Sequence, residues 1–101
     1  MKYITLAGAA GMSTSALVKR MQDAAREQGI DTDIQARPVD DVVKDLGNAD
    51  VLLLGPQVRY RLKELQGICS PKGVPVAVIN SVDYGMMNGK KVLETALDLL
   101  K

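Results

Sequence analysis

The feature that most constrains the fold is the alternation of short apolar runs with amphipathic segments along the chain. Four apolar runs cover residues 3–7, 32–36, 51–54 and 74–79, and three of them are continuous enough to be strands buried on both faces. The run 32–36 alternates apolar and polar side chains, which places it nearer an edge of the sheet. Strands that alternate with helices predict a parallel sheet covered on both faces. The predicted class is α/β, with three layers.

Helical spacing of apolar side chains marks the segments between these runs. One amphipathic helix is expected to begin at Ser13 or Thr14 and to end at Gly29. Shorter helices are expected over 39–46 and 60–68, and a last helix fills the C-terminal segment. No repeat, linker or low-complexity tract divides the 101 residues, so residues 1–101 are predicted to form a single domain.

The composition excludes several chemistries. The chain has no His, which excludes a His general base, a phosphohistidine and the usual zinc ligand sets, so no metal site is expected. The single Cys cannot form an internal disulfide. A net charge of +1 and three Tyr as the only aromatic residues argue against a nucleic-acid partner.

The same inventory bears on location. No apolar run approaches the ~20 residues that a membrane-spanning helix requires, so no direct membrane insertion is expected. The first residues lack the length and the charged lead-in of a secretory signal. A single Cys fits a reducing compartment. We therefore expect the chain to be cytoplasmic.

The loop after the first apolar run carries the main functional signal. Small residues lead there into three hydroxyl side chains at a helix start, in the order Gly8, Ala9, Ala10, Gly11, Met12, Ser13, Thr14 and Ser15. Small side chains let the backbone approach an anion, and a helix start offers unpaired N–H groups and a positive dipole end. A phosphate-binding loop and an ordinary tight turn before a helix both explain this pattern. The Lys of a Walker A motif, the Gly-x-Gly-x-x-Gly spacing and the strand-end acidic residues of a receiver domain are all missing.

Two further loops are candidates, because ligands of open parallel sheets bind beyond the carboxyl ends of the strands. Pro56 and Gln57 follow the third apolar run, where the Gln57 amide either reaches the phosphate loop or a partner, or belongs to a turn that Pro56 stiffens. Tyr84 follows the fourth run, beside Met86 and Met87. These three side chains either form a site or partner surface or cover the core.

Four other residues are given structural interpretations. Cys69 precedes a Ser-Pro turn, and we assign this thiol to packing or to a surface position. Arg59, Arg61 and Lys63 are assigned to a solvated helix face rather than to the steering of an acidic partner.

Three segments carry a family resemblance. They are Ala-Gly-Met-Ser-Thr-Ser at 10–15, Asn-Ala-Asp-Val-Leu-Leu-Leu-Gly-Pro-Gln at 48–57, and Val-Ile-Asn at 78–80 followed by Tyr84 and Gly85. They resemble the cytoplasmic enzyme IIB components of the lactose/cellobiose branch of the bacterial sugar phosphotransferase system, over essentially the whole chain. The resemblance implies a four-stranded parallel sheet in the order 2-1-3-4, with the phosphate loop at the end of the first strand.

The resemblance also implies an activity. Family members accept a phosphoryl group from a His of the IIA partner onto a Cys that ends the first strand, and pass it to the sugar that the membrane component IIC transports. No metal, nucleotide or other cofactor is implied, and a shuttling carrier is expected to be monomeric. Aligned on Gly11-Met12-Ser13, the family's Cys falls on Gly8, which has no side-chain atom to phosphorylate. The chain as it stands is therefore expected to be incompetent for phosphorylation.

Three explanations of Gly8 are open. The chain is an engineered, inactivated carrier, a natural member that lost phosphotransfer and kept binding, or a sequence whose parental gene encodes another residue there. We favour the first or the third, because the rest of the phosphate loop is present. The functional alternative is a non-catalytic partner-binding or regulatory module on the same fold. A Cys-x5-Arg phosphatase is excluded, because Gly8 and Thr14 stand at the Cys and Arg positions. The sugar stays open, because the membrane component largely recognises it in this family.

Overall fold

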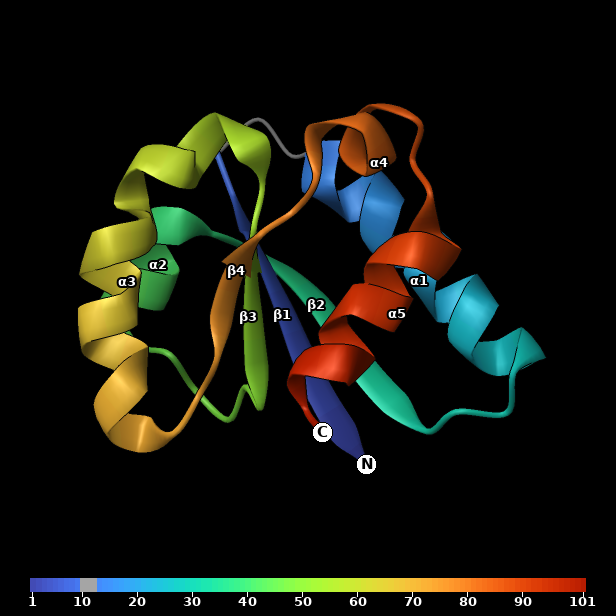
Figure 1. Cartoon of the computed structure of the whole chain (residues 1–101), viewed down its shortest axis with the longest axis horizontal. Helices are drawn as coiled ribbons and strands as arrows, with labels where there is room; N and C mark the ends of the chain where they lie inside the picture. Colours follow the sequence, from blue (N-terminus) through green and yellow to red (C-terminus); the bar gives the residue numbers. More distant parts are fainter. Residues whose placement is uncertain (10–12) are drawn as a thin grey trace.

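A four-stranded parallel sheet lies between two layers of helices in the computed structural model, which describes residues 1–9 and 13–101 and, of Ser13, only the backbone (Figure 1). The strands follow one another in the order β2-β1-β3-β4, and each neighbouring pair is parallel. Their bounds are Lys2–Gly8 for β1, Thr32–Pro38 for β2, Val51–Leu54 for β3 and Val76–Val78 for β4. The α/β class and the strand order 2-1-3-4 are confirmed.

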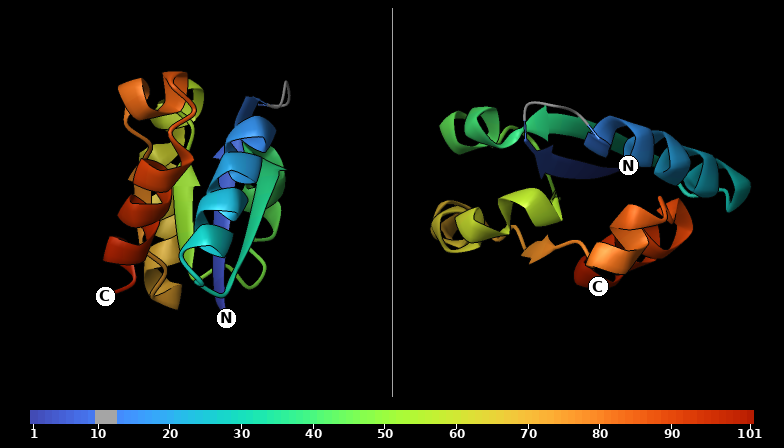
Figure 2. Two further views of the ribbon diagram at one scale, coloured as in Figure 1. Left: turned by 90° about the vertical axis from the view of Figure 1, so that its right-hand side faces the viewer. Right: turned by 90° about the horizontal axis from the view of Figure 1, so that it is seen from above.

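Helices α1 (Ser13–Glu27) and α5 (Gly89–Leu99) cover one face of the sheet, as Figures 1 and 2 show. Their apolar stripes meet alternate side chains of β1 and β3 in one core, where Leu6, Leu17 and Leu93 are buried. The end of α1 lies just before Gly29, whose φ of 67° belongs to the left-handed region that Gly adopts at little cost. The predicted stop of the first helix is thus confirmed.

Helices α2 (Val39–Lys44) and α3 (Leu62–Cys69) cover the opposite face and enclose a second core. Leu52 and Leu54 of β3 point into this core, whereas Val51 and Leu53 point into the first one. Successive side chains of a strand face opposite sides, and this explains why β3 is apolar at every position. The prediction of a strand buried on both faces is confirmed for β3.

The fourth strand differs from its prediction. Only three residues of the apolar run 74–79 pair with β3, and β4 is an edge strand with half-buried side chains rather than a strand buried on both faces. An edge strand has a neighbouring strand on one side only. The apolar side chains of run 74–79 are explained by packing against the two cores beneath the helices, not by a central position in the sheet. The predicted edge position of the second strand is confirmed.

Three short helices complete the described part of the chain. A 3-10 helix η1 (Pro56–Arg61) precedes α3, so the helix expected from residue 60 begins only at Leu62. A second 3-10 turn, η2 (Ser70–Lys72), leads toward β4. Helix α4 (Ser81–Gly85) forms where a loop was expected, because the Asn80 carboxamide oxygen accepts hydrogen bonds from the N–H groups of residues 82 and 83 at 2.8 and 3.2 Å.

The start of α1 agrees with expectation, because the helix begins at Ser13. Ser13 and Thr14 both lie inside the helix, so Thr14 does not cap it. The Thr14 side chain is instead buried against the ends of β1 and β3. Asn88 does cap α5, because its carboxamide oxygen accepts from the Lys91 N–H at 3.1 Å.

Among the described residues, none of the helices has both the length and the apolar composition needed to cross a membrane.

Candidate functional site

The carboxyl ends of β1, β3 and β4 meet at one edge of the sheet. Gly8 ends β1, Gly55 follows β3 and Asn80 follows β4. The Gly55 N–H donates to the carbonyl oxygen of Ala7 at 2.9 Å, which holds the first two ends together. Strand β2 lies on one side of β1 and β3 lies on the other side, so the strand order reverses between β1 and β3. Ligands of open parallel sheets bind at such a point.

Thr14 lies over this pair of glycine strand ends. Its side chain is 2% exposed. A Cβ atom on Gly8 would lie 2.7 Å from Thr14 Cγ2 and 2.9 Å from Thr14 Oγ1, and a Cβ atom on Gly55 would lie 3.5 Å from the same Cγ2. The first turn of α1 therefore packs directly on the end of β1.

Gln57 and Tyr84 are joined across the site edge. The Gln57 Nε2 donates a hydrogen bond to the Tyr84 Oη at 2.9 Å, which links η1 to α4. The Tyr84 ring meanwhile packs against the first core. The interpretation of Tyr84 as a cover of the core is confirmed for its ring, and its role in a site or partner surface stays a prediction. Pro56 is the first residue of η1, a position at which a backbone N–H would have no partner within the helix, so the N–H that Pro lacks costs no hydrogen bond.

Met86 and Met87 have different surroundings. Met86 is 72% exposed, whereas Met87 packs against the first core. Met87 has a φ of 52°, an unusual value for a residue other than Gly, at the turn between α4 and α5. Only Met86 is therefore available as a contact surface.

The centre of the predicted phosphate-binding loop falls outside the described residues. Ala10, Gly11 and Met12 belong there, as does the Ser13 side chain. Ala9 and Ser15 flank this stretch and are exposed. The phosphate-binding role of the loop stays a prediction.

Cys69 lies far from this edge. It ends α3, and Figure 1 shows the carboxyl end of α3 at the opposite end of the sheet from η1 and α4. Its side chain is buried in the second core. Burial raises the pKa of the Cys69 thiol, and the charge of Lys72 opposes this only in part. A neutral, buried thiol is a packing residue, as its sequence interpretation allowed.

Arg61 corrects one of the structural interpretations. Its side chain is 20% exposed and donates to Asp40 at 2.9 Å and to Glu64 at 2.7 Å, so it joins α2 to α3 instead of lying on a solvated face. These hydrogen bonds raise the pKa of Arg61. Arg59 and Lys63 are exposed as expected. The sequence pattern missed the pair with Asp40 because it spans 21 positions.

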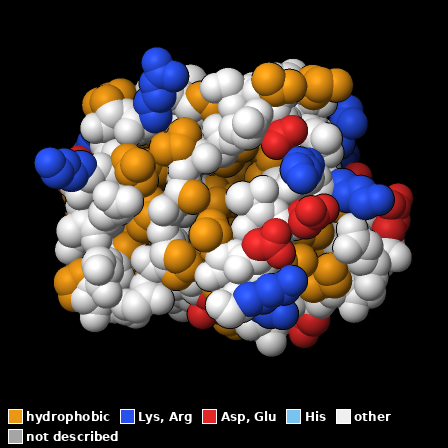
Figure 3. Space-filling model, viewed as in Figure 1, with side chains coloured by type: hydrophobic (Ala, Val, Ile, Leu, Met, Phe, Trp, Pro, Cys, Tyr) orange, Lys and Arg blue, Asp and Glu red, His pale blue; other side chains and the backbone are white. Residues whose placement is uncertain are grey.

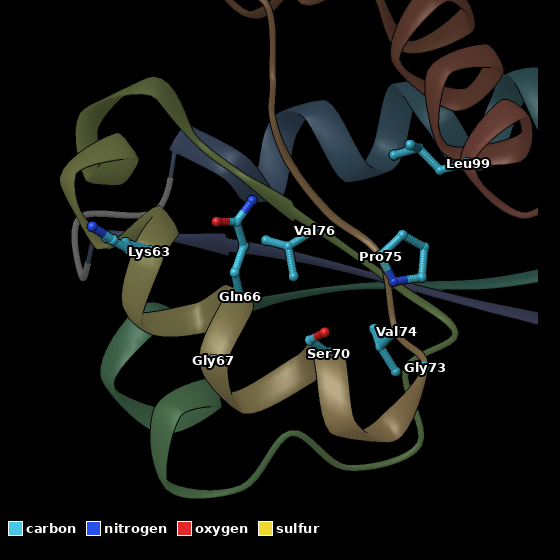
Figure 4. A pocket seen from close by; sticks show the side chains of 9 residues that line it. All are labelled: Lys63, Gln66, Gly67, Ser70, Gly73, Val74, Pro75, Val76 and Leu99. Atoms are coloured by element: carbon cyan, nitrogen blue, oxygen red, sulfur yellow. The ribbon is translucent and has the colours of Figure 1, made fainter.

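An open groove of about 840 Å³ lies elsewhere, along β4 between α3 and the end of α5. Figure 4 shows Gln66 and Val76 on its α3 side and Leu99 across from them. Figure 3 shows apolar side chains along this face of the molecule. The groove includes none of the predicted site residues. Within residues 1–9 and 13–101, no group of three or more His, Cys, Asp and Glu is placed to hold a metal ion.

Sequence comparison identifies a family. The sequence model of the family described as "PTS system, Lactose/Cellobiose specific IIB subunit" matches residues 3–95. The galactose-specific EIIB component of the phosphotransferase system (PTS) of Lactococcus lactis subsp. cremoris is 48% identical, with 98% of this chain and 96% of the relative covered. The cellobiose-specific EIIB component of Lactococcus lactis subsp. lactis is 47% identical, with the same coverage. The oligo-beta-mannoside-specific EIIB component of Bacillus subtilis is 41% identical, with 99% and 97% covered.

Solved structures agree with this assignment. The lactose-specific IIB domain from Streptococcus pneumoniae superposes with a TM-score of 0.90 over 99% of this chain and 98% of that chain, and at 16% identity it shows the fold alone. The cellobiose-specific IIB component from Borrelia burgdorferi has a TM-score of 0.79 and 41% identity, with 98% and 91% covered. The chain therefore belongs to the lactose/cellobiose-specific IIB family, the phosphotransferase IIB components of bacterial sugar transport systems.

Proposed function

We propose that this chain has the place of a phosphocarrier between a IIA phosphodonor and a IIC sugar transporter, and that Gly8 makes it incompetent for phosphorylation. The observation that carries the proposal is the position of Gly8. It ends β1 at the reversal of strand order, beside the first turn of α1. The family resemblance, aligned on Gly11-Met12-Ser13, implies a nucleophilic Cys at this position. The family assignment supports the carrier role, and the chemistry of Gly supports the loss of activity.

The surroundings of position 8 suit a thiolate. A thiolate beside a helix N-terminus has a lowered pKa, because the helix dipole and free N–H groups stabilise its negative charge. In the transfer, the sulfur would bond to phosphorus as the bond between phosphorus and the IIA imidazole breaks, and backbone N–H groups would hold the phosphoryl oxygens. Gly8 supplies no atom for this step. Cys69 cannot replace it, because it is buried at the other end of the sheet.

The exposed apolar side chains around the site support docking of the IIA protein there. Tyr60 of η1 is 75% exposed, Val82 of α4 is 65% exposed and Met86 just after α4 is 72% exposed. These three residues, which we name the rim, lie on the two segments that follow β3 and β4. A phosphohistidine must approach position 8 across this edge, so the rim is the surface that the donor protein would cover.

The proposal is tested by restoring the nucleophile. Gly8→Cys, incubated with the phosphorylated IIA protein, should gain the mass of one phosphoryl group, as read by intact mass spectrometry. The unchanged chain and Gly8→Ala, which adds bulk but no thiol, should gain nothing. The double variant Gly8→Cys, Thr14→Ala is included because Thr14 lies against position 8. No gain in either thiol variant would refute the carrier role, and a gain in the unchanged chain would refute its inactivity.

A second candidate is a non-catalytic binding module. The packed Thr14 favours it, because its side chain fills the space beyond Gly8, so that a thiol at position 8 requires Thr14 to shift. This candidate predicts that the unchanged chain binds the IIA protein as tightly as Gly8→Cys does. A parental gene that encodes Gly at position 8 would favour it, whereas a Cys codon would favour an inactivated carrier.

The names of the relatives differ in their sugars, which are galactose, cellobiose and oligo-beta-mannoside. This variety among similar chains supports a carrier whose sugar is selected by the IIC component. We place the carrier in the cytoplasm, as a monomer, because it must travel between a donor protein and a membrane component.

A further inference from the structure

The side chain of Thr14 fills the space directly beyond the backbone of Gly8. Among the described residues, the three heavy atoms nearest to a Cβ atom on Gly8 would all belong to Thr14, with Cγ2 at 2.7 Å, Oγ1 at 2.9 Å and Cβ at 3.4 Å. The first two distances are shorter than Cβ atoms show in folded proteins, so any side chain at position 8 requires a shift. Thr14 is 2% exposed, which leaves it little free volume.

The backbone at position 8 presents no obstacle of its own. Gly8 lies in β1 and pairs in register with Pro38 of β2. Its φ is not in the left-handed region, in contrast to Gly29, Gly47 and Gly73. Within the part of the chain that the structure describes, the nearest obstacle to a side chain is therefore the β-branched side chain of Thr14, which can adopt different staggered χ1 rotamers.

We propose that residue 8 and Thr14 share one buried space, so that the residue at position 8 sets the χ1 rotamer of Thr14, and that Thr14 is a positioning residue for a thiol at position 8. Both heavy atoms at the end of Thr14 now face Gly8. Rotation to another staggered well leaves only one of them facing it. With a thiol present, that atom is the hydroxyl oxygen, because an O–H group donates to a thiolate and a methyl group cannot. This second half rests on the proposed function, whereas the shared space does not.

A double-mutant cycle in thermal unfolding tests the shared space. Gly8→Ala should lower Tm by about 5 °C or more, since overpacking a buried site is destabilising. Adding Thr14→Ala should recover at least half of that loss, measured against Thr14→Ala alone, because both crowding atoms are removed. Ser15→Ala is the matched control, because Ser15 is the exposed neighbour on the same helix, and it should recover nothing.

The cycle has two outcomes that overturn the shared space. Additive Tm shifts for Gly8→Ala and Thr14→Ala would show that the two positions do not compete. If Gly8→Ala does not fold, the test becomes whether the double variant Gly8→Ala, Thr14→Ala folds. A double variant that also fails to fold overturns the proposal.

The positioning role is tested by the pKa of a thiol introduced with Gly8→Cys, in a Cys69→Ala background so that one thiol reacts. The pH dependence of alkylation by iodoacetamide reports this pKa. Adding Thr14→Val, which keeps the shape but loses the hydroxyl, should raise the thiol pKa by about one unit, and Thr14→Ser should restore it. Equal pKa values in the three proteins would overturn the positioning role. A hydroxyl-dependent pKa without phosphoryl uptake from the IIA protein would leave that role standing and overturn the proposed function.

Discussion

At the scale of single residues, the one thiol and the position that lacks one have opposite surroundings. Cys69 is enclosed by the apolar side chains of the second core, and burial raises its pKa. Gly8 lies at the edge where three strands end and a helix begins. Burial favours the neutral thiol, whereas a helix start favours the thiolate. The only thiol of the chain therefore lies where a thiol is unreactive.

The raised pKa of Cys69 predicts a loss of stability at alkaline pH. The unfolded thiol loses its proton near pH 8.5, whereas the folded thiol keeps it to a higher pH. Between these two values only the unfolded state is stabilised by ionisation, so the free energy of unfolding falls as pH rises through this window. Urea denaturation at pH 7.5 and 9.5 should show a smaller fall for Cys69→Ala than for the unchanged chain. Equal falls in the two proteins would contradict the assignment.

At the scale of elements, α5 packs against the backbone of α1 at a glycine. Gly89 is buried in the first turn of α5. A Cβ atom on it would collide with the carbonyl carbon of Arg20 and would lie 2.6 Å from the backbone nitrogen of Met21. Backbone atoms cannot swing aside as a side-chain tip does. The Asn-Gly pair at the start of α5 thus supplies both the cap of the helix, through Asn88, and its close approach to α1, through Gly89.

Substitution of two helical glycines should have opposite effects on stability. Gly89→Ala should lower the free energy of unfolding by about 1–3 kcal/mol, because the added methyl group forces the two helices apart. Gly67→Ala, in the exposed part of α3 where nothing lies within 4 Å of the new Cβ, should raise it by about 0.5–1 kcal/mol. Chemical denaturation of both variants measures this. A neutral Gly89→Ala would show that the helices separate easily.

At the scale of the whole molecule, the carboxyl edge of the sheet gathers the features that bear on function. The reversal of strand order, the two glycine strand ends, the Gln57–Tyr84 hydrogen bond and the exposed rim all lie there. Cys69 and the open groove along β4 lie outside this edge. The proposed docking of a phosphoryl donor therefore rests on this edge of the sheet.

The rim gives a prediction about partner binding. Val82→Asp with Met86→Asp should weaken binding of the unphosphorylated IIA protein by about tenfold or more, because the loss of two apolar contacts costs over 1 kcal/mol. Leu99→Asp is the matched control, since Leu99 is also apolar and exposed but lies beside the groove. Calorimetric titration at fixed salt compares the three proteins. Equal weakening by Leu99→Asp and by the rim variant would place the interface elsewhere.

The elements themselves were largely predictable from local patterns. Apolar runs and helical spacing identified the four strands and the two long helices, because these periods repeat over several residues. Helix α4 was missed, because its five residues are too few to show a period, although Asn80 held a capping signal. The apolar run 74–79 did not reveal an edge strand, because helices can cover an edge strand as well as a central one, and only the strand order implied by the family resemblance placed β4 at the edge.

The sequence by itself determined the α/β class, the family resemblance and the absence of a nucleophile at Gly8, because these depend on composition, short periods and residue identity. The tertiary structure alone decided that Gln57 donates to Tyr84 and that Thr14 occupies the space of a Gly8 side chain. Both contacts join segments whose distance in space depends on strand order and helix packing. The local spacing of apolar residues carries no information about such a distance. Two residues that are far apart in the sequence can therefore be recognised as a pair only in the folded chain.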